Sequence, residues 1–218
     1  MIKNLTILLA LILLSTCEIG ADLSTLTSVD AFKCLLQNQT FLNVRAWRSF
    51  GAFDSNSIQT LANAKTAGYK IENLGVYMFP CMSPNKPASD QVNSMVEALK
   101  NSEYSGLWID METNTNPGCG WTKDYDANCQ FTEQLVNAAK KSGKNVGIYA
   151  SHYMWTQIFG STTFCSKFSY LPLWYARYDH NPSFDDFQEF GGWTKPSVKQ
   201  FQGTTAICNA SIDFNYRP

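Results

Sequence analysis

The order of strand-like and helix-like segments constrains the folds open to this 218-residue chain more than any single motif does. Five times in succession, a short apolar segment of strand character is followed by an amphipathic segment of helical period. The strand-like segments cover residues 20–24, 41–47, 73–79, 106–111 and 145–150, and the helical segments cover residues 28–37, 55–67, 88–101, 128–141 and 152–159. Such alternation predicts parallel strands that are joined by crossover helices.

The helical segments stop after residue 159. Three further strand-like segments follow at residues 172–177, 198–202 and 211–216, joined by loops. This order predicts an α/β fold, an irregular TIM-like barrel with five β/α units followed by three β-strands. An open, doubly wound sheet is the alternative, but no glycine-rich phosphate turn of the Rossmann or P-loop kind follows a strand. We therefore favour a barrel, formed by residues 18–218 as a single domain.

The first 17 residues have the pattern of a secretory signal peptide. Lys3 precedes an apolar run from Leu5 to Leu14, and small residues lead to a plausible cleavage point after Cys17. The apolar run is too short to span a membrane. We expect residues 1–17 to be removed and the mature chain to be secreted, or to reside in the lumen of a compartment of the lysosome or phagosome type.

The charge balance argues against two classes of partner. The chain has 17 Lys and Arg residues against 18 Asp and Glu residues, so that loss of Lys3 with the signal leaves a formal charge of −2. This balance favours neither nucleic acid nor an anionic membrane surface as a partner. We expect the mature protein to be a monomer.

Two carboxyl groups end the strand-like segment at residues 106–112, "GLWIDME", although acidic residues are rare in strands. Successive side chains of a strand point to opposite faces. Leu107 and Ile109 should therefore face the helices, as should Met111, whereas Asp110 and Glu112 face the barrel axis.

Two more acidic residues are predicted at the same rim. Asp22 ends the first strand, and Asp213 lies in the last strand, which neighbours the first if the barrel closes. Barrel enzymes carry their chemistry at the strand ends, and glycoside hydrolysis needs one protonated and one ionised carboxyl. The four carboxyls therefore indicate a glycosidase, with a capping or turn role as the simpler alternative for Asp22 and Asp213.

Further inward-facing side chains suit a carbohydrate. They are Arg45, Trp47, Tyr77, Tyr149 and Trp174. Sugars stack their C–H faces on aromatic rings, while their hydroxyls need polar partners. Core packing is the alternative for each ring, and for Arg45 the alternative is an ion pair that holds the acids in place. A Ser-His-Asp hydrolase is not favoured, because the chain has two histidines and no nucleophile-elbow motif.

Six short stretches, in their order along the chain, resemble motifs of glycoside hydrolase family 25, the Chalaropsis-type lysozymes, and especially of the family's branch in nematodes and protists. The stretches that carry the resemblance are "GADLS" (20–24), "LWIDME" (107–112), "VGIYAS" (146–151), "PLWYARY" (172–178), "VKQFQ" (198–202) and "IDFN" (212–215). The resemblance implies a flattened barrel and cleavage of the β-1,4 bond between N-acetylmuramic acid and N-acetylglucosamine in bacterial peptidoglycan.

The resemblance also implies roles for individual residues. Glu112 carries over as the general acid, Asp110 as its catalytic partner, and Asp22 and Asp213 as supporting acids. We assign Asp22 to the catalytic set, and we assign to substrate binding Asp213, Tyr77, Tyr149, Trp174 and Arg45. No metal and no cofactor is expected, since none of the cysteines forms a C-x-x-C pair.

Six cysteines stay in the mature chain, and in an exported protein they predict three disulfides among fifteen possible pairings. Compared with the family, an insertion follows Glu112, and Cys119 and Cys129 flank part of it. We predict that these two cysteines pair. By elimination and sequence order, the other predicted pairs are Cys34–Cys81 and Cys165–Cys208.

Two other functions fit the same residues. A chitin-cleaving glycosidase of family 18 also ends a barrel strand in Asp-x-Glu, but the earlier part of that motif is absent around Gly106 and Leu107. A secreted lectin-like protein that binds peptidoglycan or chitin without cutting it belongs to a different class. The presence of all four acids favours an enzyme over a lectin.

Overall fold

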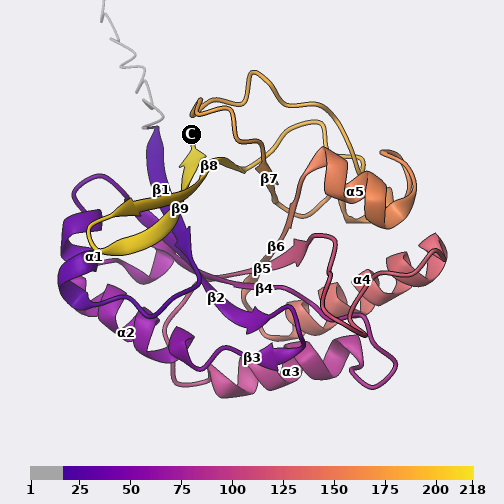
Figure 1. Cartoon of the computed structure of the whole chain (residues 1–218), viewed down its shortest axis with the longest axis horizontal. Helices are drawn as coiled ribbons and strands as arrows, with labels where there is room; N and C mark the ends of the chain where they lie inside the picture. Colours follow the sequence, from indigo (N-terminus) through magenta and orange to yellow (C-terminus); the bar gives the residue numbers. More distant parts are fainter. Residues whose placement is uncertain (1–16) are drawn as a thin grey trace, which may run out of the picture.

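The computed structural model describes residues 17–218, and it shows a closed barrel that helices flank at the left, bottom and right of Figure 1, while its last strands carry no helix. The first 16 residues, which hold most of the expected signal peptide, lie outside the described residues. Eight strands of the described chain form the barrel: β1 (Glu18–Leu23), β2 (Phe41–Arg48), β4 (Leu74–Met78), β5 (Gly106–Met111), β6 (Asn145–Ala150), β7 (Leu173–Ala176), β8 (Val198–Ile207) and β9 (Ala210–Arg217). The short strand β3 (Ala52–Phe53) extends β2 as an antiparallel ribbon.

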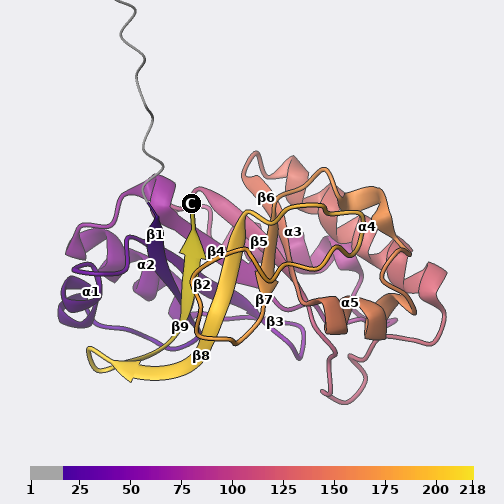
Figure 2. The ribbon, with the colours of Figure 1, turned by 90° about the horizontal axis from the view of Figure 1, so that it is seen from above.

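Barrel closure depends on the last strand. The strands from β1 through β2, β4, β5, β6 and β7 to β8 pair in parallel, in sequence order. Strand β9 then lies antiparallel between β8 and β1, and it joins the two ends of the sheet. Figure 2 shows β8 and β9 as a long hairpin that carries no covering helix. The predicted order of five β/α units and three final strands is therefore confirmed.

The helices follow the first strands as predicted, although α1 and α3 end two and three residues before the predicted ends. They are α1 (Val29–Leu35), α2 (Asn56–Ala67), α3 (Ala88–Ala98), α4 (Tyr125–Lys141) and α5 (His152–Phe159), with 3₁₀ turns at Ile71–Asn73 and Ser166–Phe168. Side chains of Ser28, Asp124 and Ser151 accept hydrogen bonds from the first turns of α1, α4 and α5. Helix α2 ends at Gly68, whose φ of 113° falls in the region that glycine tolerates best. No helix within residues 17–218 is both long and apolar enough to cross a bilayer.

Two apolar layers result from the alternation along the strands. Leu107, Ile109 and Met111 of β5 are fully buried in the layer between the barrel and the helices, as predicted. Inside the barrel, Phe41, Tyr149, Trp174 and Val198 form a second cluster, with Trp108 packed against it. The inner cluster fills the barrel below the strand ends, so that the rim stays open for polar side chains.

Trp47 does not face the barrel interior, and that prediction is wrong. The register of β2 against β4 shifts between Arg45 and Trp47, which turns the side chain of Trp47 outward. Its indole N–H donates to Gln91 Oε1 of α3 at 3.1 Å, and its ring packs in the outer layer. A β-bulge of this kind reverses the inward and outward faces, and simple alternation does not reveal it.

The described chain contains three disulfides, and all three predicted pairings are wrong. The structure pairs Cys34 with Cys208, Cys81 with Cys119, and Cys129 with Cys165. Sequence order fails because strand order decides which segments meet: β9 lies beside β1, so the β8–β9 turn comes close to α1. The loop after β5 likewise reaches the loop after the neighbouring β4, and Cys129 sits inside α4 rather than at the end of the insertion.

Removing the bridge between Cys34 and Cys208 is expected to lower the free energy of unfolding by about 4 to 5 kcal/mol. The bridge spans 174 residues, and closing a loop on the order of 100 residues or more removes that much chain entropy from the unfolded state. Thermal unfolding of the variant with both cysteines changed to Ala measures the loss. Peptide mapping without reductant checks the pairing itself, and a fragment joining Cys119 to Cys129 would contradict the structure.

Candidate active site

Four carboxyl groups meet at the end of the barrel where the parallel strands finish. Asp22 comes from β1, Asp110 and Glu112 come from the end of β5, and Asp213 comes from β9. In the pairing of β1 with β9, Asp22 lies directly opposite Asp213. The structure therefore brings together the four acids that the sequence places on one rim.

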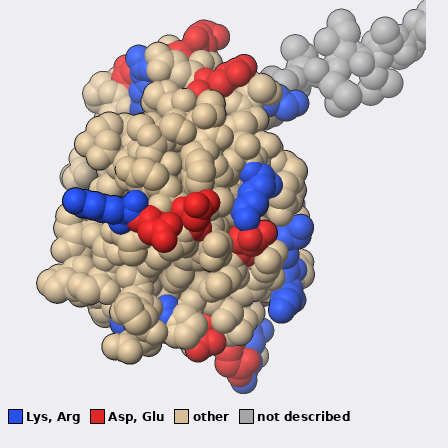
Figure 3. Space-filling view, turned by 90° about the vertical axis from the view of Figure 1, so that its right-hand side faces the viewer, with Lys and Arg blue, Asp and Glu red and all other residues tan. Residues whose placement is uncertain are grey.

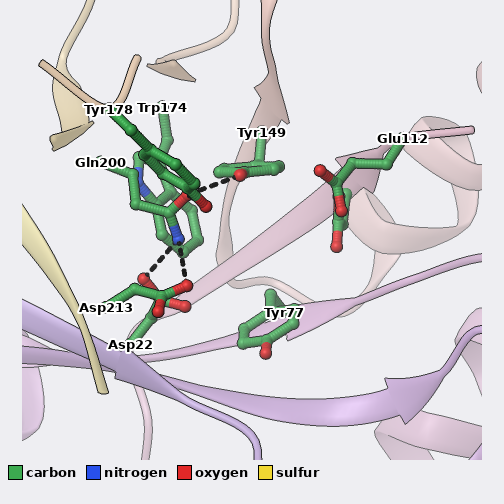
Figure 4. A pocket seen from close by; sticks show the side chains of 9 residues that line it. Asp22, Tyr77, Glu112, Tyr149, Trp174, Tyr178, Gln200 and Asp213 are labelled. Atoms are coloured by element: carbon green, nitrogen blue, oxygen red, sulfur yellow. Dashed lines mark hydrogen bonds between the residues drawn. The ribbon is translucent and has the colours of Figure 1, made fainter. Parts of the chain in front are cut away.

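These acids line a cavity of about 110 Å³ that opens at the rim. Its lining consists of Asp22, Tyr77, Asp110, Glu112, Tyr149, Trp174, Tyr178, Gln200 and Asp213. Figure 4 shows Asp22 and Asp213 together on one side and Glu112 on the other, with Tyr77 and Tyr149 between them. The cavity therefore has an acid pair at one wall and a separate acid, Glu112, facing it across the opening.

Aromatic side chains make the floor and walls of this cavity. Trp174 is 2% exposed, and its indole N–H donates to Asn215 Oδ1 at 2.7 Å. The ring of Tyr149 meets the ring of Trp174 edge to face at 4.6 Å, and Tyr77 packs on the same indole at 6.2 Å. Because Trp174 and Tyr149 are buried, they shape the pocket rather than offer an open stacking surface.

Two residues of the pocket, Tyr178 and Gln200, are missing from the set predicted from sequence. Gln200 follows Val198 at the two-residue spacing of β8, and Val198 packs inside the barrel, so alternation indicates that Gln200 also points inward. Tyr178 lies two residues beyond β7, in a loop, where strand alternation gives no guidance. Its ring is 58% exposed, and it covers the pocket from the side of β7 and β8.

Arg45 is assigned to substrate binding from the sequence, with an ion pair to the rim acids as the alternative; it does not line the pocket, and the acid that it pairs with is Asp54 instead. Its guanidinium pairs with Asp54 at 2.9 Å and donates to the backbone carbonyl of Ser24 at 3.0 Å. Asp54 also pairs with Arg48 at 2.8 Å, and the two arginines hold the pKa of this buried carboxyl below its usual range. Arg45 thus fixes the segment after β1 and β2, next to the site.

The cluster raises the pKa of every acid in it. Burial, and then the charges of Glu112 and Asp22, raise the pKa of Asp110 well above its usual range. Burial and the charge of Asp213 raise the pKa of Glu112. Burial raises the pKa of Asp213, although the amide of Thr204 opposes the shift. At neutral pH, part of this cluster therefore holds protons, and an acid of this kind is suited to general acid catalysis.

The pKa of Asp22 shows most clearly how burial and hydrogen bonding oppose each other in this cluster. Burial and then the charge of Asp213 raise its pKa to about 8, while hydrogen bonds from Asn215 and Gln200 oppose the rise. Both amides donate to the same oxygen, Oδ2, at 2.7 and 2.8 Å. Asp22 is thus tied into the barrel wall, whereas Glu112 accepts no such side-chain donor within the described residues.

Residues 17–218 contain no group of three His, Cys, Asp or Glu residues that is arranged to hold a metal ion. The cavity lining combines acids with the amide of Gln200, and such groups can transfer protons and stabilise charge. Figure 3 shows the face on the side of α4 and α5, where acidic and basic side chains are interspersed over a mostly uncharged surface.

Comparison with known proteins agrees with this geometry. The family model described as "Lysozyme-like protein 1" matches residues 14–201. The chain is 39% identical over 202 residues to "Probable GH family 25 lysozyme 2" of Dictyostelium discoideum, which covers 91% of this chain and 90% of that protein. It is 34% identical over 219 residues to "Lysozyme-like protein 5" of Caenorhabditis elegans, with 98% of both chains covered.

A solved structure shares the fold at much lower identity. The muramidase from Trichobolus zukalii superposes with a TM-score of 0.70 over 92% of this chain and 93% of its own, at 22% sequence identity. The fold is therefore shared with a structure that has diverged far in sequence. From the family match and the relatives above, the chain belongs to the lysozymes of glycoside hydrolase family 25.

Proposed function

We propose that this lysozyme is an exported enzyme that hydrolyses the β-1,4 bond between N-acetylmuramic acid and N-acetylglucosamine in bacterial peptidoglycan. The observation that carries the proposal is the set of four carboxyls on three strand ends around one cavity. The names of the relatives support a lysozyme activity, and the three disulfides within residues 17–218 suit an oxidising compartment.

Glu112 is the general acid of the proposed reaction. It lies at the mouth of the cavity, half-buried, and burial followed by the charge of Asp213 raises its pKa, which favours the protonated form that a general acid needs. Protonation of the glycosidic oxygen lets the sugar leave as the bond to the anomeric carbon breaks. The deprotonated Glu112 then takes a proton from a water molecule, and that water attacks the anomeric carbon and completes the hydrolysis.

Asp110 is the partner of Glu112 in this scheme. Its carboxyl is 5% exposed, two residues before Glu112 on the same strand, and its Oδ1 is buried without a hydrogen-bond donor among the described residues. A substrate with a 2-acetamido group brings an amide N–H that satisfies such an acceptor. The acetamido oxygen is then oriented toward the anomeric carbon, where positive charge develops, in a substrate-assisted reaction.

The other wall of the cavity positions the sugar. Asp22 and Asp213 offer carboxylate oxygens to sugar hydroxyls, while the rings of Tyr77, Tyr149 and Trp174 shape the pocket. Arg45 is not among the proposed substrate contacts, because Asp54 and the Ser24 carbonyl already engage it. The mature enzyme is proposed to act as a monomer.

Loss of turbidity in a suspension of Gram-positive cell walls tests the proposal, with the purified mature protein as enzyme. Mass spectrometry of the released fragments should show new reducing ends on N-acetylmuramic acid. Cleavage of chitin oligosaccharides without cleavage of cell walls would instead support a chitinase, and binding to walls without release would support a lectin.

The rate of lysis is expected to follow a bell-shaped pH curve with its maximum on the acidic side of neutral. The alkaline limb reports loss of the proton from Glu112, and the acid limb reports protonation of Asp110; these roles require that the substrate N–H, by donating to Asp110, lower its pKa below that of Glu112 in the complex. Since both pKa values are raised, both limbs should lie above the value of about 4 that is usual for a carboxyl. Initial rates against pH at constant ionic strength measure the curve, whose apparent values belong to the coupled cluster. A maximum in alkaline solution would exclude these roles.

A further inference from the structure

We propose that Gln200 is a positioning residue of this active site, whose amide group holds Asp22 and Asp213 together as a pair. Its Nε2 donates to Asp22 Oδ2 at 2.8 Å and to Asp213 Oδ2 at 3.1 Å, as Figure 4 shows. The inference rests on the glycosidase chemistry proposed above, since it assigns Gln200 a role in that reaction.

Two tyrosines fix the orientation of the Gln200 amide. The hydroxyl of Tyr149 donates to Gln200 Oε1 at 2.6 Å, and the hydroxyl of Tyr178 donates to the same oxygen at 2.9 Å. A glutamine amide has two N–H donors and one oxygen with two lone pairs. All four positions are used here, and a flipped amide would place its oxygen against two carboxyls.

Both phenols keep the protons that they donate. Burial, and then the charges of Glu112 and Asp110, raise the pKa of Tyr149 well above its usual range, and burial raises the pKa of Tyr178 as well. Since each phenol has a single proton and gives it to Gln200, the two phenolic oxygens act only as acceptors toward the cavity. The wall formed by these residues therefore suits the O–H and N–H groups of an amino sugar.

The acid pair that Gln200 holds acts on Glu112 through its charge. Asp213 is the neighbouring charge that raises the pKa of Glu112, so an ionised Asp213 keeps the general acid protonated. Donors to Asp22 and Asp213 stabilise their ionised forms. Without these donors, the pair should hold a proton to higher pH, the charge near Glu112 should fall, and Glu112 should lose its proton at lower pH.

A substitution at Gln200 leaves the other titratable and charged groups around Glu112 unchanged in the sequence. They are Asp110 on β5, Tyr77 on β4, Tyr149 on β6, Tyr178 after β7, Asp22 on β1, Asp213 on β9, and Arg45 on β2 with its partner Asp54. A change at Gln200 removes the two hydrogen bonds to the acid pair and the acceptor of the two phenols; since both phenols stay neutral, a shift of the charge near Glu112 reports on the acid pair.

The test compares Gln200→Met with Gln202→Met, a matched change two residues along β8. Gln202 donates to Thr205 at 2.9 Å and is not part of the cavity lining. We expect Gln200→Met to lower the rate of lysis by about 10-fold or more, and to shift the alkaline limb of the pH curve down by roughly one pH unit. Gln202→Met should leave both the rate and the limb near wild type.

A folded Gln200→Met protein whose pH limbs stay at the wild-type positions would overturn the proposal, since a packing role alone lowers the rate without moving the limbs. If this variant does not fold, the double variant Tyr149→Phe/Tyr178→Phe decides, because it keeps both rings and removes the two hydroxyls that orient the Gln200 amide toward the acid pair. A smaller shift of the alkaline limb in the same direction supports the proposal, and an unchanged limb overturns it.

A readout that does not depend on activity separates this inference from the proposed function. The pKa of Asp22 is raised in the folded state, so its contribution to stability is lost as pH rises from about 4 toward about 8. Without the Gln200 donors, this loss should extend to higher pH. The fall in melting temperature from pH 5 to pH 9 should then be larger in Gln200→Met than in Gln202→Met. This difference is expected whether or not the wild type lyses cell walls. Absence of lysis by the wild type would count against the proposed function alone.

Discussion

Replacing Glu112 by Gln is expected to lower the rate of cell-wall lysis by about 100- to 10,000-fold while the protein still folds. Gln keeps the size of the side chain and removes its transferable proton. Glu112 lies at the mouth of the cavity, and no arginine or lysine side chain of the described residues forms a salt bridge with it. The substitution therefore breaks no ion pair, and the loss of rate reports the loss of the acid itself.

A second, independent prediction is the direction in which the melting temperature of Glu112→Gln changes. Since the folded state raises the pKa of Glu112, stability is lost as pH rises through that pKa, and Gln removes this loss. Glu112→Gln should therefore melt at an equal or higher temperature than wild type at pH 8. Glu97→Gln, an exposed change on α3, is the control for both measurements. Lysis at near the wild-type rate by a well-folded Glu112→Gln protein would mean that another group is the general acid.

The fold could be predicted from sequence because its signals are local and repeated. Strand and helix periods act within a few residues, and their alternation along the chain gives the order of elements. The alternation in β5 placed Asp110 and Glu112 on the inner face and Leu107, Ile109 and Met111 on the outer face. Strand ends of a barrel then share one rim, and so Asp22 and Asp213 were predicted to join them.

The errors come from features that local patterns do not encode. The bulge after Arg45 turns Trp47 out of the barrel, and one extra residue in a strand is invisible in an alternating pattern. The disulfides depend on which loops meet after closure, so Cys34 finds Cys208 from the far end of the chain. Tyr178 lies in a loop, where neither helical nor strand periodicity applies.

Arg45 and Gln200 are both polar residues of barrel strands, but only Gln200 reaches the site. Arg45 has an acidic neighbour, Asp54, on the segment that follows its own strand, and the ion pair keeps its charge away from the cluster. Gln200 carries no charge, yet its amide contacts two of the four acids. The pairing of Arg45 with Asp54 depends on how the chain folds back after the strand, which alternation does not reveal, whereas the two-residue spacing from Val198 does place Gln200 inside the barrel.

Replacing Asp110 by Asn is expected to lower the rate of lysis by about 100- to 1,000-fold, which is the cost typical of removing one group that stabilises charge in a transition state. Asn keeps the shape of the side chain but replaces a carboxylate oxygen by an NH₂ group. Asp110 Oδ1 is buried with no donor among the described residues, so the free site has an acceptor that a substrate N–H can satisfy. An NH₂ group at this position would meet that N–H donor to donor.

The pH dependence of this variant separates Asp110 from Glu112. If protonation of Asp110 causes the acid limb, the remaining activity of Asp110→Asn should lose that limb and keep only the fall on the alkaline side. The curve is measured beside wild type and beside Asp185→Asn, an exposed aspartate outside the cavity lining. An unchanged acid limb in Asp110→Asn would assign that limb to Asp22 or Asp213, whose pKa values are also raised, and would leave Asp110 without the proposed role.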